Sequence, residues 1–191
     1  MSNQDGAYGL VPHRHISGGE IRSNAYQIAS GYAANIFRGD PVIMAADGTL
    51  QIAAALSVAI IGVFAGVKFT DALGNITYSG HWPSGTVATD IEAMVYDDPN
   101  TTFKVQTDAT GAVEADKGAL CSLEIVAGDP KTSQSKTNLD VSAGLAATGK
   151  QMRILRLIDN GGYNEPGPFS QVEAIFAVHA IKGVVAGVGG V

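Results

Sequence analysis

Short runs of alternating apolar and polar residues recur along most of this 191-residue chain, and glycine, aspartate, asparagine or proline separates them. A period of two is typical of strands with one buried face, whereas amphipathic helices repeat every three to four residues. No long stretch has the helical period, and only Gly111 to Gly118 is expected to form one helical turn. The pattern predicts a mainly β protein, a single-domain antiparallel β-barrel or β-sandwich with an extended N-terminal arm and long loops.

The clearest hairpin in the pattern is Ile60 to Trp82. Its first strand is Ile60 to Thr70, the turn is "DALGN", and the second strand begins at Ile76. Gly62 and Gly66 lie inside the first strand, where glycine marks a bulge or the close approach of another backbone. We therefore expect a curved hairpin.

Other strands are expected at short intervals. The Asp-Gly pair at 47–48 predicts a second hairpin between Pro41 to Ala45 and Thr49 to Ala53. Further strands are predicted at Ile91–Tyr96, Thr102–Gln106, Leu120–Val126, Arg153–Ile158 and Gln171–His179. The polar stretch from Lys131 to Gly149 has no clear period and is interpreted as a long loop.

The two ends of the chain differ in composition from its middle. Residues 1–23 have few periodic hydrophobic residues and several glycines, so they are interpreted as the extended N-terminal arm. Residues 24–182 form the predicted β-rich domain. Residues 183–191, "GVVAGVGGV", are apolar and uncharged and are interpreted as a C-terminal tail.

The chain carries few charges. Charged residues make up 16% of the chain, against about 25% in typical globular domains, and the formal net charge is -6. A surface so poor in charge favours a protein that stays in contact with other subunits. The basic residues are scattered, which argues against nucleic acid as a partner, and no stretch approaches the roughly 20 apolar residues of a membrane span. The N-terminus lacks the pattern of a secretory signal.

Candidate catalytic and metal sites are weak. Cys121, the one cysteine, lies in an apolar strand-like run, and nothing local pairs it with His81 or His179 as nucleophile and base. His13 and His15 share one face of a strand, but Glu20 is their one nearby candidate ligand, so no metal site is expected. No cofactor is expected either, because the C-terminal glycines lack the Lys-Ser/Thr of a phosphate-binding loop.

Two short motifs are interpreted as structural. The tripeptide Arg38-Gly39-Asp40 occurs in some adhesion ligands, but with Pro41 it serves equally as a turn before a strand. The one tryptophan, Trp82, has no second aromatic cluster beside it for stacking on a polymer. It is interpreted as an apolar anchor at a barrel end or a subunit contact, whose indole nitrogen needs an acceptor.

Four segments carry a resemblance to a known family. They are "AYGLVPHRHISGG" (Ala7–Gly19), "IGVFAGVKFTDALG" (Ile61–Gly74), "SGHWPSGT" (Ser79–Thr86) and "VYDDPNTTFKVQTD" (Val95–Asp108). In their order and spacing they resemble small virion proteins of tailed bacteriophages, the structural, decoration or cement proteins encoded near the major capsid protein.

The resemblance implies a non-enzymatic, β-rich protein that binds the outer surface of the phage head, commonly as a homotrimer, after assembly in the host cytoplasm. Its partner would be the major capsid protein, whose neighbouring subunits it clamps against the pressure of the packaged DNA. Two alternatives stay open: another virion component, such as a head-tail connector, tail or minor shell protein, and a small sugar-binding or hydrolytic protein that uses Trp82 and His81.

Candidate partner contacts lie in the arm, at the tryptophan and in the loop "NGGYNEPGPF". The arm supplies apolar or conformationally stiff side chains, and the loop carries aromatic residues among glycines and prolines. The predicted contact residues are Tyr8, Leu10, Val11, Pro12, His13, His15, Trp82, Tyr163 and Phe169. From the sequence alone, deletion of residues 1–19 is expected to leave a folded protein that no longer decorates heads.

Overall fold

The computed structural model describes residues 3–182 apart from 56, 58 and 159–163. Over these residues the chain is almost entirely strand and loop. The strands are β1 (Val11–His15), β2 (Asn24–Tyr26), β3 (Ile36–Phe37), β4 (Pro41–Met44), β5 (Leu50–Ile52), β6 (Ile60–Thr70), β7 (Ile76–Ser79), β8 (His81–Trp82), β9 (Thr89–Tyr96), β10 (Thr101–Gln106), β11 (Leu120–Glu124), β12 (Asn138–Asp140), β13 (Met152–Leu157) and β14 (Gln171–Phe176), with one 3-10 turn, η1 (Glu114–Asp116). None of the described helical segments has the length and apolar character of a membrane span.

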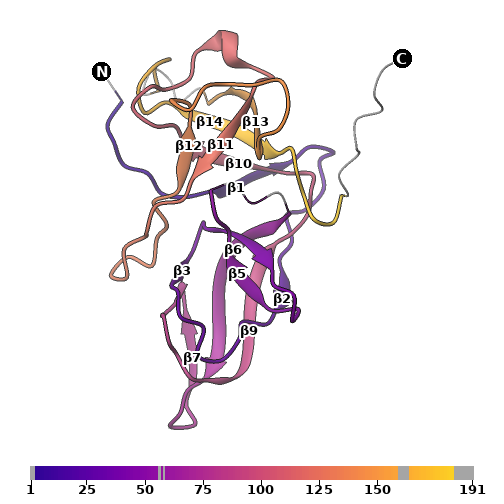
Figure 1. The fold of residues 1–191 in the computed structure, drawn as a ribbon, viewed down its shortest axis with the longest axis vertical. Helices are drawn as coiled ribbons and strands as arrows, with labels where there is room; N and C mark the ends of the chain where they lie inside the picture. The colour runs from indigo at the N-terminus through magenta and orange to yellow at the C-terminus, as the bar shows by residue number, and fades with distance from the viewer. Residues whose placement is uncertain (1–2, 56, 58, 159–163, 183–191) are drawn as a thin grey trace.

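Two antiparallel sheets make up the body of the protein (Figure 1). Sheet A has the order β1-β10-β14-β13-β11-β12 and forms the upper part of the view. Sheet B has the order β2-β9-β6-β4-β5, with β7 also paired to β6, and forms the lower part. A short ribbon of β3 and β8 lies beside sheet B.

Strand β6 connects the two cores because its side chains divide between them. Ile60 and Val63 join the residues of sheet A in one hydrophobic cluster. Phe64 and Phe69 join a second cluster, which covers one face of sheet B. One long strand therefore contributes buried side chains to the cores of both sheets.

The prediction of a mainly β, antiparallel fold is confirmed. Both sheets are open, with β1 and β12 at the edges of sheet A, so the sandwich-like alternative holds and the barrel does not. Both predicted hairpins form, since Met44 pairs with Leu50 and Thr70 pairs with Ile76. The single helical turn is present as η1.

The interior glycines of β6 act as the pattern indicated. The β6–β9 register shifts between Phe64 and Gly66. A Cβ at Gly62 would overlap the carbonyl oxygen of Tyr96, so only glycine fits there. The hairpin is thereby bent at the point where it passes from one core to the other.

Two expectations need correction. The stretch from Lys131 to Gly149 is not all loop, because Asn138–Asp140 forms β12 at the edge of sheet A. The return strand of the hairpin is also interrupted: β7 ends at Ser79, and β8 pairs with β3 instead. Strands β12 and β8 are only three and two residues long, too short for a period-two pattern to identify.

Candidate partner-binding surface

The described part of the arm lies along its own chain. Leu10 is 1% exposed and belongs to the sheet A core, and its N–H donates to the Gly39 carbonyl at 2.9 Å. Asn3 bonds through its side chain to the Glu165 and Pro168 carbonyls. The structure thus places Leu10 in the core, although the sequence reading took it for a partner contact.

An ion-pair cluster fastens β1 to sheet A. Arg14 Nε donates to Glu173 Oε1 at 2.5 Å, and Arg156 Nε donates to the other carboxylate oxygen at 2.6 Å. The Glu173 side chain is fully buried. Burial opposes its ionisation, but hydrogen bonds from Arg14, Thr102 and Arg156 hold the pKa of Glu173 below its ordinary value. The edge strand therefore neutralises a charge inside the sheet.

The histidines of β1 differ in their surroundings. His15 Nε2 lies 3.0 Å from Asp98 Oδ2, and its other ring nitrogen contacts Ser17 Oγ at 3.0 Å. Its side chain is only 10% exposed. His13 is exposed, as are Val11 and Arg14 beside it, while Pro12 is partly buried. Of the two histidines, His13 is the one open to a partner.

Tyr8 is partly buried beside Lys104, whose Nζ lies 5.9 Å from the ring centroid. Burial raises the pKa of the Tyr8 phenol, and its hydroxyl oxygen has no hydrogen-bond partner among the described residues. Phe169 is half-buried with φ of 56°, in a loop against the end of sheet A. Tyr163 lies outside the described residues.

Trp82 is an interior residue. It is 0% exposed in the sheet B core, and its ring meets Phe69 edge-to-face at 5.5 Å. The expected acceptor for the indole nitrogen is absent among the described residues. The anchor interpretation holds inside the chain, but the structure removes Trp82 from the surface that a partner could reach.

The Arg38-Gly39-Asp40 motif is likewise built into the fold. Asp40 is 0% exposed, and it accepts hydrogen bonds from the Phe37 N–H, the Ser135 hydroxyl and the Thr137 hydroxyl. Burial raises the pKa of Asp40 against the opposing effect of these bonds. The motif is therefore a buried turn, as interpreted, and only Arg38 reaches solvent.

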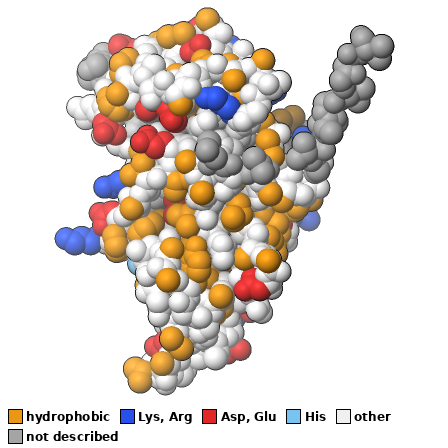
Figure 2. All heavy atoms as spheres, viewed as in Figure 1, with side chains coloured by type: hydrophobic (Ala, Val, Ile, Leu, Met, Phe, Trp, Pro, Cys, Tyr) orange, Lys and Arg blue, Asp and Glu red, His pale blue; other side chains and the backbone are white. Residues whose placement is uncertain are grey.

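The β6–β7 hairpin carries exposed apolar side chains, whereas the arm buries its Leu10 side chain in the core. Leu73, Ile76 and Tyr78 are 87%, 63% and 76% exposed, and we call these three residues the hairpin patch. The hairpin projects from the lower end of the molecule, and apolar side chains gather at its tip (Figures 1 and 2). On the face shown, charged side chains are few and scattered. An exposed apolar cluster on a protruding element is typical of an interaction site.

Period-two alternation explains the hairpin patch, which sequence reasoning missed. In "ITYS", Thr77 pairs with the buried Phe69, so Thr77 and Ser79 lie on the core side while Ile76 and Tyr78 point outward. The alternation was visible in the sequence. From the sequence, Ile76 was only the start of a strand, and neither side of that strand was assigned to the core.

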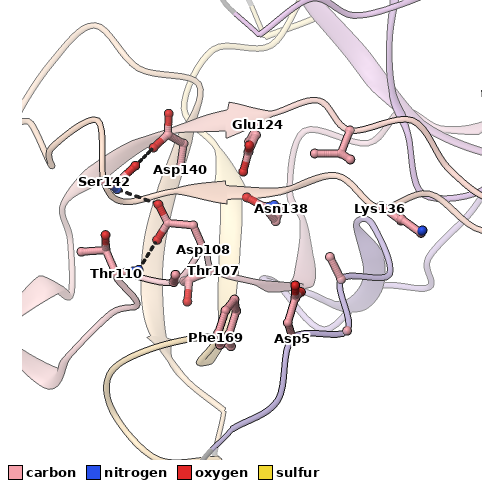
Figure 3. Close-up of a pocket in the computed structure, with 14 residues that line it drawn as sticks. Asp5, Thr107, Asp108, Thr110, Glu124, Lys136, Asn138, Asp140, Ser142 and Phe169 are labelled. Atoms are coloured by element: carbon pink, nitrogen blue, oxygen red, sulfur yellow. Dashed lines mark hydrogen bonds between the residues drawn. The ribbon is translucent and has the colours of Figure 1, made fainter.

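A polar groove of about 640 Å³ lies at one end of sheet A, between the arm and β11–β12 (Figure 3). Asp108 and Asp140 line it, but both carboxylates cap turns. Asp108 accepts from the N–H groups of Thr110 and Ser142, and Asp140 accepts from the Ser142 hydroxyl. These two carboxylates are therefore engaged in holding loops of the fold, while Asp5 and Glu124 also line the groove.

Chemistry at the other titratable groups is equally limited. Cys121 is buried, and burial raises the pKa of its thiol to about 12, which leaves it protonated and inert near neutral pH. His81 stacks on Phe37, and its Nδ1 lies 2.9 Å from Ser133 Oγ. Among the described residues, no group of three or more His, Cys, Asp or Glu side chains is arranged to hold a metal ion.

No protein-family model, curated protein or solved structure matches this chain.

Proposed function

We propose that the chain is a non-enzymatic virion protein that binds the outer surface of an assembled phage head and stabilises it as a cement or decoration protein. The resemblance of its sequence segments suggests the partner, the major capsid protein. The observation that carries the proposal is the hairpin patch, because Leu73, Ile76 and Tyr78 are exposed on a projecting hairpin of a weakly charged protein.

A homotrimer fits this role physically. A patch of three side chains is far smaller than a stable interface, which buries about 1,200–2,000 Å². Three linked copies on a repetitive shell add their contacts, because each later contact forms at high effective concentration once the first is made. Weak individual patches then suffice for tight binding to a shell.

The sugar-binding or hydrolytic alternative loses its main support. Its stacking residue, Trp82, is 0% exposed and therefore unable to stack on a sugar. A connector or tail role uses the same kind of surface as a cement role, and copy number separates them. A cement protein approaches the stoichiometry of the shell subunit, whereas a connector ring has about a dozen copies.

The direct test mixes the purified chain with expanded heads of the phage that encodes it and images the complex. We expect density on the outer surface at near-stoichiometric copy number. The double variant Leu73→Ser, Ile76→Thr should fold normally and lose most decoration. The control Val113→Ser, at a valine near sheet A that is 45% exposed, should decorate like the wild type. Absence of binding by the wild type would reject the proposal.

A further inference from the structure

Sheet B has one face covered by its core and one face open. Along β6 and β9 the residues that alternate with the core positions are Lys68, Thr70, Glu92 and Met94, and all are partly or fully exposed. Tyr78 of β7 pairs with Lys68 and lies on the same face. The open face is therefore continuous across three strands.

A groove of about 560 Å³ hollows this open face. Its apolar lining comes from small or flexible side chains, including Ala65 and Met94, and Tyr78 stands at its side. Gly66 and Gly80 line the groove without side chains of their own, and the Gly80 carbonyl already accepts the Arg38 N–H. Because β6 is paired by both β7 and β9, a ligand on this face is held by side chains and not by a free strand edge. An extended segment presents every second side chain to one side, so it can place a charged and an apolar side chain on this face together.

The charges at the groove do not balance. Lys68 Nζ lies 3.3 Å from Glu92 Oε2, so these two side chains neutralise each other. Arg38 also lines the groove and is exposed, and among the described residues its guanidinium makes no ion pair or hydrogen bond. One cation is thus left available on a protein whose net charge is -6.

We propose that this groove binds an extended segment of a partner protein in which a carboxylate side chain and an apolar one, two residues apart, point to the same side. The Arg38 guanidinium presents paired N–H donors that match a planar carboxylate. Tyr78 and Met94 offer an apolar surface beside it. A nucleic acid is a poor fit, because a single free cation neutralises little of a polyanion that the overall negative charge repels.

The inference rests on the proposed function only for the identity of the partner, the shell subunit. Its chemistry is testable without heads. The probe is the blocked hexapeptide acetyl-Thr-Val-Thr-Asp-Thr-Val-amide, in which an extended backbone puts both valines on the same side as Asp, and the matched control carries Asn in place of Asp. Amide NMR spectra of the full chain should shift at Arg38, Gly66, Tyr78 and Met94 with the Asp peptide, and Arg38→Gln should weaken this binding about tenfold or more.

Several results would overturn the inference: no shift at these residues, equal shifts with the Asn peptide, or concentration-dependent shifts of the free protein that reveal a second copy in the groove. On heads, Arg38→Gln should reduce decoration, while Lys117→Gln, which removes a positive charge just after η1, should not. Wild-type protein that binds the Asp peptide but not heads would reject the proposed function alone. Decoration unaffected by Arg38→Gln, with no peptide binding, would reject the groove alone.

Discussion

Strands β1 and β7 both lie at sheet edges, but the leucine that precedes β1 is buried whereas the leucine that precedes β7 is exposed. Leu10, just before β1, is 1% exposed, whereas Leu73, just before β7, is 87% exposed. The arm supplies Leu10 to the sheet A core and Arg14 as a counter-ion for Glu173. Removing the arm therefore exposes part of that core and takes one arginine away from the Glu173 carboxylate. The hairpin extends beyond the core it helps to build. An apolar residue near a chain end is thus no sign of a free surface.

The largest effect is expected from deleting residues 1–15. The deletion removes Leu10 from the core, takes Arg14 from a buried carboxylate and leaves β10 as an unprotected edge. Loss of a core leucine alone costs about 2–5 kcal/mol, and the whole fold of a typical domain is stable by about 5–15 kcal/mol. We expect the truncated chain to be largely unfolded by near-ultraviolet circular dichroism.

This expectation revises the one drawn from sequence, in which the truncated protein stays folded. A truncated protein with native spectra and an unchanged urea midpoint would restore the view of the arm as a free binding segment. It would also show that the contacts of Leu10 and Arg14 add little to stability.

The two leucines allow a matched comparison of the two regions. Leu10→Ala should lower the free energy of unfolding by about 2–5 kcal/mol, because it leaves a cavity in the sheet A core. Leu73→Ala should change it by less than about 0.5 kcal/mol, because its side chain already contacts water. Urea unfolding of both variants measures the difference, and equal losses would contradict the contrast between arm and hairpin.

Much of the fold could be predicted from the sequence because turn residues and period-two runs are local signals. The hairpins about Asp47-Gly48 and Asp71-Asn75 are of this kind. Which face of a strand is buried depends on what the rest of the chain places against it. For that reason the alternation at Ile76 and Tyr78 was readable but its direction was not.

The candidate site was harder to predict for the same reason. Arg38 was interpreted as part of a turn, and that interpretation is correct for the backbone. Its role at the groove depends on β7 and β9, which the fold brings to it from far along the chain. Pairing of Lys68 with Glu92, which leaves Arg38 as the uncompensated charge, also requires the β6–β9 register.

A smaller loss is expected from Arg14→Ala, which removes one of two arginines from Glu173. Breaking a fully buried ion pair costs about 3–5 kcal/mol, but Arg14 is 49% exposed and Arg156 keeps its bond to the carboxylate. We expect a loss of about 1–3 kcal/mol in urea unfolding at neutral pH. Because the pKa of Glu173 is lowered in the fold, this contribution is present above pH 4.5 and fades as pH falls through the folded value. A loss that stays undiminished down to the lowest pH at which the protein remains folded would contradict the ion-pair account.

The smallest expected effect is a dependence of stability on pH near neutrality, and it again distinguishes the β1 end from the β6–β7 hairpin. His179 is 3% exposed and lies near Asp97 and Asp98. Asp98 also contacts His15 of β1. The Nδ1 atom of His179 accepts the Ile181 N–H at 3.2 Å. Burial lowers the pKa of His179 below 6.5, against the opposing charges of the two aspartates. The unfolded chain therefore binds more protons below pH 6.5, and stability falls as pH decreases through this range, by at most about 1.4 kcal/mol per pH unit.

The substitution His179→Gln should flatten this dependence between pH 7 and 5, because a glutamine oxygen can still accept the Ile181 N–H without titrating. Amide hydrogen exchange locates the effect: protection should fall first around β1 and the β9–β10 turn. The hairpin turn should keep its protection in this range, because N–H groups led by that of Asn75 lower the pKa of Asp71 and keep it ionised. If acidification to pH 5 reduced amide protection in the hairpin before it did so around β1, the contrast between the buried β1 arm and the exposed hairpin would be wrong.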